Sequence, residues 1–251
     1  PKNLAIVSSA SEILNQFPYL FKIQKNSKIL LVESDFPSLY RPWISYSQKK
    51  ENKIHIEFIK DKRNFDLTES IITKIDKNTK FVIVSYVQFA TGSMIDVLRL
   101  RKMTNKYGVR LIIDITQAAG AIPINFKDWG CDALISSGYK WLEGHGGVAI
   151  AALSDEILNS IPFNIGWMGA KNPFKFSNKS FSLAYDARRF TQSTMSYSSI
   201  KSLEISINQL QELGIENIRK HTENLKEILI KYLYKTNWTL FHNQKLSFSS
   251  P

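Results

Sequence analysis

Four short runs of the sequence are almost continuously apolar and rich in β-branched residues, and amphipathic stretches separate them. The runs are KILLVES (28–34), KFVIVSYV (80–87), RLIIDI (110–115) and CDALIS (131–136). Strands that are covered on both faces have this composition, because neither face meets water. Segments 11–21, 67–75 and 94–108 have helical spacing, and the last ends at Gly108, a frequent helix C-cap. This alternation predicts an α/β fold, a three-layer sandwich with a mainly parallel central sheet flanked by helices.

The remaining segments set the expected domain boundaries. GVAIAAL (147–153) predicts a further strand of undetermined direction, and the chain from about residue 196 predicts helices interrupted near Gly214. We expect residues 1–212 to form a large domain and residues 213–251 to begin a smaller C-terminal domain. Because the chain starts at Pro1 and ends soon after a helical stretch, we expect the large domain to lack its N-terminal part and the small domain to be truncated.

The net charge of +11 does not by itself indicate a partner. The Lys and Arg residues are dispersed, and their densest cluster, KDKRNF (60–65), lacks the interleaved aromatic residues of a nucleic-acid surface. The sequence contains no apolar run of the roughly 20 residues that cross a bilayer. We therefore expect neither a nucleic-acid nor a membrane partner.

Cysteine and histidine usage bears on location and on metal binding. A single cysteine, Cys131, excludes an intrachain disulfide and predicts a reducing, cytoplasmic location. The four histidines are scattered without metal-ligand spacing, so no metal site is expected. His145 lies in the glycine-rich segment 136–147 and is a candidate to line a site there.

Polar side chains follow the ends of the predicted strands. Ligands of open parallel sheets bind outside the carboxyl ends of the strands, so these residues are candidates for a site. The candidates are Glu33 to Pro37, Gln88 to Gly92, Asp114, Thr116, Gln117, Ser136, Ser137, Tyr139 and Lys140. Taken singly, Asp114 is better explained as a cap of the next segment and Lys140 as a solvated side chain. The convergence of the whole set favours a site.

A lysine and a carboxylate at one rim of a sheet indicate pyridoxal phosphate (PLP) chemistry. This cofactor needs a lysine amine for a Schiff base and an acid that keeps its pyridine nitrogen protonated. Its phosphate needs hydroxyl and backbone N–H donors, which the start of a helix provides. VSSASEIL (7–14) enters a predicted helix through Ser8, Ser9, Ala10 and Ser11 and predicts a phosphate cup. An ordinary serine N-cap is the alternative.

The segment DITQAAGAIPINFKDWGCDALISSGYKWLEGHGG (114–147) resembles the class V aminotransferase family of fold type I PLP enzymes. The resemblance lies in an Asp-x-x-Gln element followed by a Ser-Gly-Tyr-Lys-Trp-Leu element. Supporting similarities cover most of the chain and are SSASE (8–12), DFPSLYRPW (35–43), SYVQFATG (85–92), RRFTQST (188–194) and LGIENIRKH (213–221). The family includes cysteine desulfurases, selenocysteine lyases, kynureninases, isopenicillin-N epimerases and several aminotransferases.

The resemblance implies a role for each matching residue. Lys140 would form the Schiff base and shuttle protons, and Asp114 would pair with the pyridine nitrogen. Gln117 would hydrogen-bond the phenolic oxygen of the ring, and Phe36 would lie on the ring face. The implied phosphate ligands are Ala10, Ser11, Ser137 and Tyr139, and Ser9 and Gln88 complete the expected cofactor-binding set. In family homodimers the position of Thr194 reaches the phosphate of the neighbouring subunit, so we expect a homodimer with a shared active site.

The sequence also departs from the cysteine desulfurases. The stretch Asp35-Phe36-Pro37-Ser38 stands where desulfurases carry a histidine and is more similar to kynureninases and epimerase-like members, and Phe89 stands at a desulfurase asparagine. Thr191 and Ser193 replace the usual Glu and Gly, which weakens the implied role of Thr194. The family's catalytic cysteine and substrate-carboxylate arginine belong to a C-terminal region that we expect this chain to lack. Cys131 is therefore expected in the core, and Arg188 and Arg189 are expected to be structural.

We therefore expect a PLP-dependent enzyme that acts on an amino acid or another small amine through Lys140, in the first place an aminotransferase. An amino-acid lyase or hydrolase of the cysteine desulfurase or kynureninase kind is the alternative. A non-catalytic PLP-fold binding protein is disfavoured, because it would have no reason to keep Asp114, Gln117 and Lys140. Gly138 and Gly144 are expected to let the lysine loop approach the cofactor inside a partly desolvated pocket.

Overall fold

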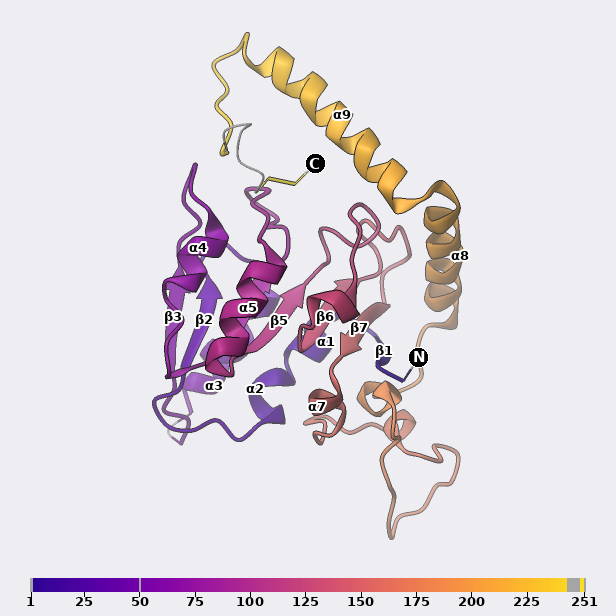
Figure 1. Cartoon of the computed structure of the whole chain (residues 1–251). Coiled ribbons are helices and arrows are strands. Elements are labelled where there is room, and N and C mark those ends of the chain that lie inside the picture. Colours follow the sequence, from indigo (N-terminus) through magenta and orange to yellow (C-terminus); the bar gives the residue numbers. More distant parts are fainter. Residues whose placement is uncertain (1, 50, 243–248, 251) are drawn as a thin grey trace.

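The computed structural model describes residues 2–49, 51–242, 249 and 250. Within these residues the strands are β1 (Leu4–Val7), β2 (Lys28–Val32), β3 (His55–Ile59), β4 (Thr79–Ser85), β5 (Arg110–Asp114), β6 (Ala133–Ser137) and β7 (Ala149–Leu153). They form one sheet in the order β1-β7-β6-β5-β4-β2-β3. Among the described strands, the pairs β1–β7 and β6–β7 are antiparallel, and the other pairs are parallel. The mainly parallel sheet expected from the sequence is confirmed (Figure 1).

The four apolar runs of the sequence form β2, β4, β5 and β6. All five residues of β2 and all five of β6 are buried, as strands covered on both faces require. The sequence did not predict β1 and β3. β1 is only four residues long, and β3 is an edge strand with exposed positions, so neither has a strong apolar signal. Pairing with distant residues, such as Leu4 with Ala152, places β1 in the sheet.

Helices flank the sheet. They are α1 (Ala10–Leu14), α2 (Phe17–Leu20), α3 (Pro37–Ser47), α4 (Leu67–Ile72), α5 (Val97–Tyr107), α6 (Phe126–Trp129), α7 (Asp155–Leu158), α8 (Tyr197–Leu213) and α9 (Ile215–Leu233). Segment 11–21, expected as one helix, forms the separate helices α1 and α2, because Pro18 has no N–H with which to continue α1. α5 ends at Gly108 with a φ of 64°, which confirms the predicted C-cap.

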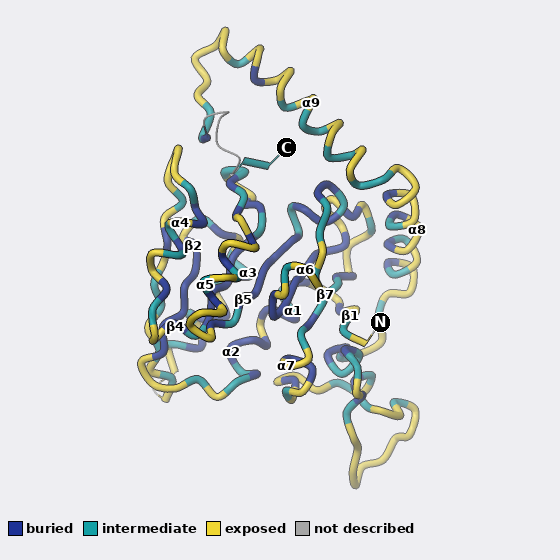
Figure 2. Tube along the Cα trace, viewed as in Figure 1, coloured by how far each residue is buried: buried dark blue, intermediate teal, exposed yellow. Residues whose placement is uncertain are grey.

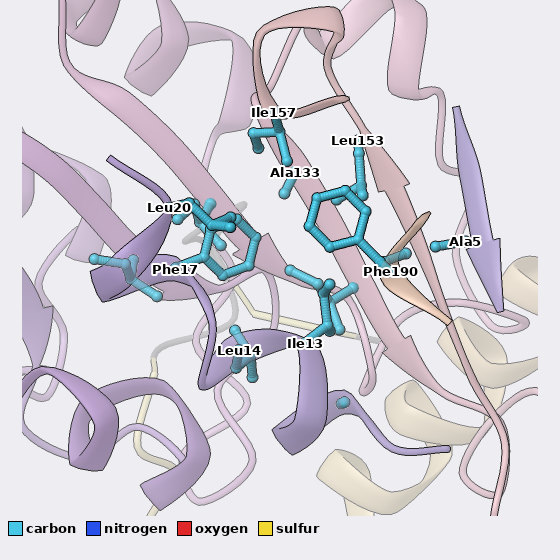
Figure 3. Close-up of a cluster of buried hydrophobic side chains, with 14 of the residues drawn as sticks. Ala5, Ile13, Leu14, Phe17, Leu20, Ala133, Leu153, Ile157 and Phe190 are labelled. Carbon is cyan, nitrogen blue, oxygen red and sulfur yellow. The ribbon is translucent and has the colours of Figure 1, made fainter. Parts of the chain in front are cut away.

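Two hydrophobic cores lie on opposite faces of the sheet. Along β5, Ile112 belongs to the first core, whereas Leu111 and Ile113 belong to the second. Figure 3 shows part of the first core, where side chains of α1 and α2 gather with Phe190 over β6 and β7. The second core contains residues of α4, α5 and α8, including Leu203. Helices on both faces therefore complete the three layers.

The C-terminal part of the described chain is helical. α8 packs on the second core, and Gly214, with a φ of 80°, separates it from α9, which confirms the predicted break. Figure 2 shows that most of α9 is exposed or partly exposed, and Ile230 is its buried residue. The division between residues 1–212 and 213–251 stays a prediction. None of the helices in the described ranges is long and apolar enough to cross a membrane.

Two arginines hold the long connection between α7 and α8. This connection contains the short 3-10 helices η1 (Trp167–Gly169) and η2 (Ala187–Phe190). Arg188 donates hydrogen bonds to the carbonyls of Met168 and Ala170, both at 2.8 Å. Arg189 donates to the carbonyl of Ala184 at 2.9 Å. The structural role expected for the two arginines is confirmed.

Candidate active site

A cavity of about 150 Å³ opens at the carboxyl ends of the parallel strands. It lies between the ends of β4, β5 and β6, the turn after β2 and the start of α1. Its lining residues are Ser9, Ala10, Ser11, Phe36, Ser38, Ser85, Phe89, Asp114, Thr116, Gln117, Ser137, Tyr139 and Lys140. The fold thus brings most of the predicted site residues together from segments that are far apart in the sequence.

A larger cavity of about 630 Å³ lies elsewhere, against α9. Its lining includes Thr91 and Gly92 together with residues of α9 and the segment Leu240–His242. Among the described residues, the two cavities have no lining residue in common. We place the candidate active site in the smaller cavity, because ligands of parallel sheets bind at the carboxyl ends of the strands.

Asp114 is the last residue of β5 and the buried carboxylate of the cavity. The backbone N–H of Thr116 donates a hydrogen bond to its Oδ1 at 2.7 Å. Burial raises the pKa of Asp114 to about 6, since water no longer solvates the charged form, and the hydrogen bonds from Thr116 oppose this shift. A carboxyl group with this pKa exchanges a proton readily near neutral pH.

Lys140 lies in the loop that follows β6 and lines the same cavity. Its side chain is exposed, so the partly desolvated pocket expected around it is not formed by the described residues of this chain. The loop is held by a hydrogen bond from the backbone N–H of Gly144 to the carbonyl of Gly138 at 2.8 Å. This turn carries the lysine amine to the cavity, where Nζ lies 5.7 Å from the ring centroid of Tyr139.

The glycines of the lysine loop serve close packing inside the protein. A Cβ at Gly138 would lie 2.9 Å from the carbonyl oxygen of Val148, and one at Gly144 would lie 3.1 Å from Cδ1 of Leu203 on α8. Gly138 and Gly144 therefore let β7 and α8 approach the loop. The expectation that they let the loop approach the cofactor stays a prediction, because these internal contacts explain both glycines without testing it.

Hydroxyl groups line the side of the cavity next to α1. The Ser9 hydroxyl caps α1 by accepting a hydrogen bond from the backbone N–H of Glu12 at 3.1 Å. The hydroxyls of Ser11 and Ser38 lie 2.7 Å apart. Thr116 Oγ1 accepts from the backbone N–H of Ser137 at 3.1 Å. Serine and threonine hydroxyls of this kind are suitable partners for a phosphate group.

An aromatic corner and an amide complete the cavity. The rings of Phe36 and Phe89 meet edge to face, with centroids 5.6 Å apart, and each is about half exposed. The side-chain oxygen of Gln117 accepts a hydrogen bond from the indole N–H of Trp141 at 3.2 Å. Gln117 is thereby oriented by the lysine loop itself.

Several candidates from the sequence lie outside the cavity lining, among them Gln88, Thr194 and His145. Gln88 is buried and donates a hydrogen bond to Oδ2 of Asp35 at 3.0 Å. Thr194 is exposed on the surface. His145 follows the lysine loop without reaching the cavity. Roles for these residues at a cofactor stay predictions.

The sequence analysis missed Ser38 as a site residue. Ser38 lies in the first turn of α3, a helix that was not predicted, and the signal that could have revealed it is Pro37. Proline is frequent in the first turn of a helix, so Pro37 predicts a helix start directly after the candidate Phe36. A helix start there places the next side chain, Ser38, beside the cavity.

A comparison with protein families agrees with this site. The sequence model of the family "Aminotransferase class-V" matches residues 2–247. The chain belongs to the class V aminotransferase family. Enzymes of this family depend on PLP and include transferases and lyases, so the cofactor expected from Lys140 and Asp114 is the cofactor of the family.

Individual relatives of this class V chain have several activities. An uncharacterized aminotransferase of Bacillus subtilis (strain 168) is 25% identical over 92% of this chain and 60% of its own length. A kynureninase of Bacillus mycoides is 26% identical over 92% of this chain and 55% of its own length. The apo cysteine desulfurase of Thermococcus onnurineus NA1 has the same fold, with a TM-score of 0.85, 22% identity, and coverage of 99% of this chain and 62% of that chain. The chain therefore spans less than two thirds of the length of these proteins.

The residues present in this class V chain fit PLP. Asp114 is a buried carboxylate with a raised pKa, which suits a partner for a protonated pyridine nitrogen. Lys140 supplies a primary amine in the same cavity, and the hydroxyls of Ser9, Ser11 and Ser38 supply donors for a phosphate. The chemistry of this donor set matches each functional part of the cofactor.

Proposed function

We propose that this class V chain is the cofactor-binding part of an enzyme that acts on an amino acid or another small amine, with transamination as its reaction. The observation that carries the proposal is that Asp114 and Lys140 line one cavity together with a row of hydroxyl groups. A carboxylate, an amine and phosphate-binding hydroxyls are the three requirements of PLP catalysis. No single one of them would be sufficient.

Two residues carry the chemistry in this proposal. Bound PLP supplies an electron sink for the bonds around the carbon that bears the substrate amine. Asp114 holds a proton at the pyridine nitrogen, and its buried position keeps water from competing for that proton. Lys140 provides the amine that attaches the cofactor and then carries a proton to and from the substrate carbon.

The remaining cavity residues orient the cofactor. Ser9, Ser11 and Ser38, which line the cavity, would bind the phosphate, and Ser137 and Tyr139 would contribute from the side of the lysine loop. Phe36 would pack on the ring, and Gln117, which Trp141 holds by a hydrogen bond, would bind the ring oxygen. These contacts hold the reacting atoms in one arrangement, which lowers the entropic part of the barrier.

A lyase or hydrolase reaction of the kynureninase kind is the second candidate. Several curated relatives are kynureninases, and the Phe36–Phe89 corner gives the mouth of the cavity an apolar wall. A screen of amino acids with and without a keto-acid acceptor separates the two reactions. Turnover that requires the acceptor supports transamination, and turnover without it supports the second candidate.

Two substitutions test the proposal. Lys140→Ala should abolish both turnover and the absorbance of lysine-linked PLP, although PLP can still be held through its phosphate. Asp114→Asn should keep that absorbance and lose most of the activity, because the covalent link survives while the proton at the ring nitrogen is lost. Lys127→Ala, a change at an exposed lysine on α6, is the control and should behave like the wild type. An unchanged absorbance band in Lys140→Ala would show that another lysine holds the cofactor.

A further inference from the structure

Asp35 is a buried carboxylate next to the cavity that the proposed function does not use. It follows β2 and is 3% exposed. Its Oδ1 accepts hydrogen bonds from the Ser85 hydroxyl at 2.5 Å and from the backbone N–H of Phe36 at 2.8 Å. Its Oδ2 accepts from the backbone N–H of Ser85 at 2.8 Å and from the side-chain amide of Gln88 at 3.0 Å. Four donors surround two oxygens, and these hydrogen bonds favour the ionised carboxylate against burial, which raises the pKa of Asp35.

The partners of Asp35 belong to the wall of the cavity. Phe36 and Ser85 line the cavity, and Gln88 directly precedes Phe89, which also lines it. The loop around Gln88 closes on itself through a hydrogen bond from its backbone N–H to the carbonyl of Ser93 at 2.8 Å. Asp35 thus connects the turn after β2, the end of β4 and the loop after β4. One carboxylate therefore holds the two segments that carry the rings of the aromatic corner.

Asp35 also lies close enough to Asp114 to act on it. Ser85, which donates two hydrogen bonds to Asp35, is paired with Asp114 in the register of β4 with β5. Burial raises the pKa of Asp114, and the negative charge of Asp35 acts in the same direction. Apart from Asp114, the described lining residues include one charged side chain, Lys140, and one further titratable side chain, Tyr139. Asp35 does not line the cavity, but it is the carboxylate whose charge acts on Asp114.

We propose that Asp35 is a positioning residue of this site, whose buried carboxylate acts on Asp114 across Ser85 and whose hydrogen bonds hold the segments that carry Phe36 and Phe89. The consequence for PLP rests on the proposed function, because a proton held by Asp114 matters only if a ring nitrogen shares it. The coupling between the two carboxylates does not depend on the cofactor. The coupling can therefore be measured in the cofactor-free protein.

The experiment titrates Asp114 in the cofactor-free protein. Carboxyl ¹³C NMR on protein labelled at aspartate gives the midpoint, and the signal is assigned by its loss in Asp114→Asn. Asp35→Asn should lower the midpoint of Asp114 by about one pH unit, because it removes a like charge beside it. The same variant should weaken PLP binding roughly tenfold, since the amide places an NH₂ against N–H donors and releases the aromatic corner.

Asp132→Asn is the matched control. Asp132 is also a buried carboxylate, and it accepts hydrogen bonds from the backbone N–H of Leu111 at 2.8 Å and from Arg101 at 2.9 Å. It precedes β6 and does not line the cavity. Its substitution should destabilise the protein without moving the midpoint of Asp114 or the affinity for PLP. A purely structural role for Asp35 would make the two variants behave alike.

An unchanged Asp114 midpoint in Asp35→Asn, or an equal change in Asp132→Asn, overturns the inference. If Asp35→Asn does not fold, Ser85→Ala replaces it. Ser85→Ala removes one donor from Asp35 and makes its carboxylate easier to protonate. It should therefore lower the Asp114 midpoint by a smaller amount than Asp35→Asn does. An unchanged midpoint would overturn the inference. Failure of the wild-type protein to bind PLP would refute the proposed function, and the titration would still decide the coupling.

Discussion

Leu203 of α8 packs directly on Gly144 of the lysine loop. A Cβ at Gly144 would lie 3.1 Å from Cδ1 of Leu203 and 3.0 Å from the carbonyl oxygen of Gly138. A second contact joins the same two elements, because the Ser206 hydroxyl donates to the carbonyl of Glu143 at 3.1 Å. A helix that begins far along the chain from Lys140, at Tyr197, therefore determines where the loop with this lysine lies.

Gly144→Ala is expected to disturb the lysine loop. The new methyl group meets both Leu203 and the backbone of Gly138, so the loop or α8 must shift. We expect a loss of about 1–3 kcal/mol in the free energy of unfolding and a weaker affinity for PLP. Gly146→Ala is the control, since a Cβ there meets nothing within 4 Å. Urea unfolding and PLP titration measure both effects, and equal behaviour of the two variants would contradict the prediction.

Asp114 is expected to reduce the stability of the cofactor-free protein above about pH 6. Its pKa is raised from 3.8 to about 6 in the folded state, so the folded protein binds more protons than the unfolded chain between these values. Stability therefore falls as the pH rises through this window, by about 3 kcal/mol in total, and then stays level. Asp114→Asn should remove the penalty while Asn Oδ1 still accepts from Thr116.

Urea unfolding at about pH 4 and about pH 8 tests this dependence. The gain of Asp114→Asn over the wild type should be larger at the higher pH, because the buried charge exists only there. A gain that is the same at both pH values would mean that burial does not raise the pKa of Asp114.

Cysteine desulfurase activity is not expected. Phe36 stands where desulfurases carry a histidine, and Cys131 is buried in the second core. Burial raises the pKa of the Cys131 thiol to about 12, so the thiolate needed for sulfur transfer does not form near neutral pH. Cys131 should stay unreactive towards a thiol reagent until urea unfolds the protein. Alanine release from cysteine at a rate comparable with the turnover of the best other substrate would contradict this prediction.

A homodimer with a shared site is expected, with Thr194 near the phosphate bound by the partner subunit. Thr194 is exposed and lies outside the cavity of its own chain, which leaves its hydroxyl available to a second copy. A shared site makes PLP affinity depend on dimerisation. Sedimentation with and without PLP should show a dimer, and Thr194→Ala should weaken PLP binding several-fold. A monomer that binds PLP tightly would refute this arrangement.

The residues at the strand ends could be predicted because their signals are local. Asp114 ends an apolar run and Lys140 follows another, so the sequence was sufficient to assign each to one rim of a parallel sheet. The mainly parallel sheet could be predicted for the same reason, since a strand covered on both faces is apolar along its own length. These properties depend on neighbours in sequence.

The supporting contacts depended on the tertiary structure. Ser11 and Ser38 are 27 positions apart in the sequence, and Asp35 and Ser85 are 50 apart, yet each pair is joined by a side-chain hydrogen bond. Both contacts arise because β2 lies beside β4 in the sheet and α3 packs against α1, an order of elements that no periodicity records. The sequence alone predicted which groups are candidates for chemistry, through their places beside apolar runs. Only the packing of distant segments decided how those groups are held, because burial and hydrogen bonding between them exist only when the sheet has formed.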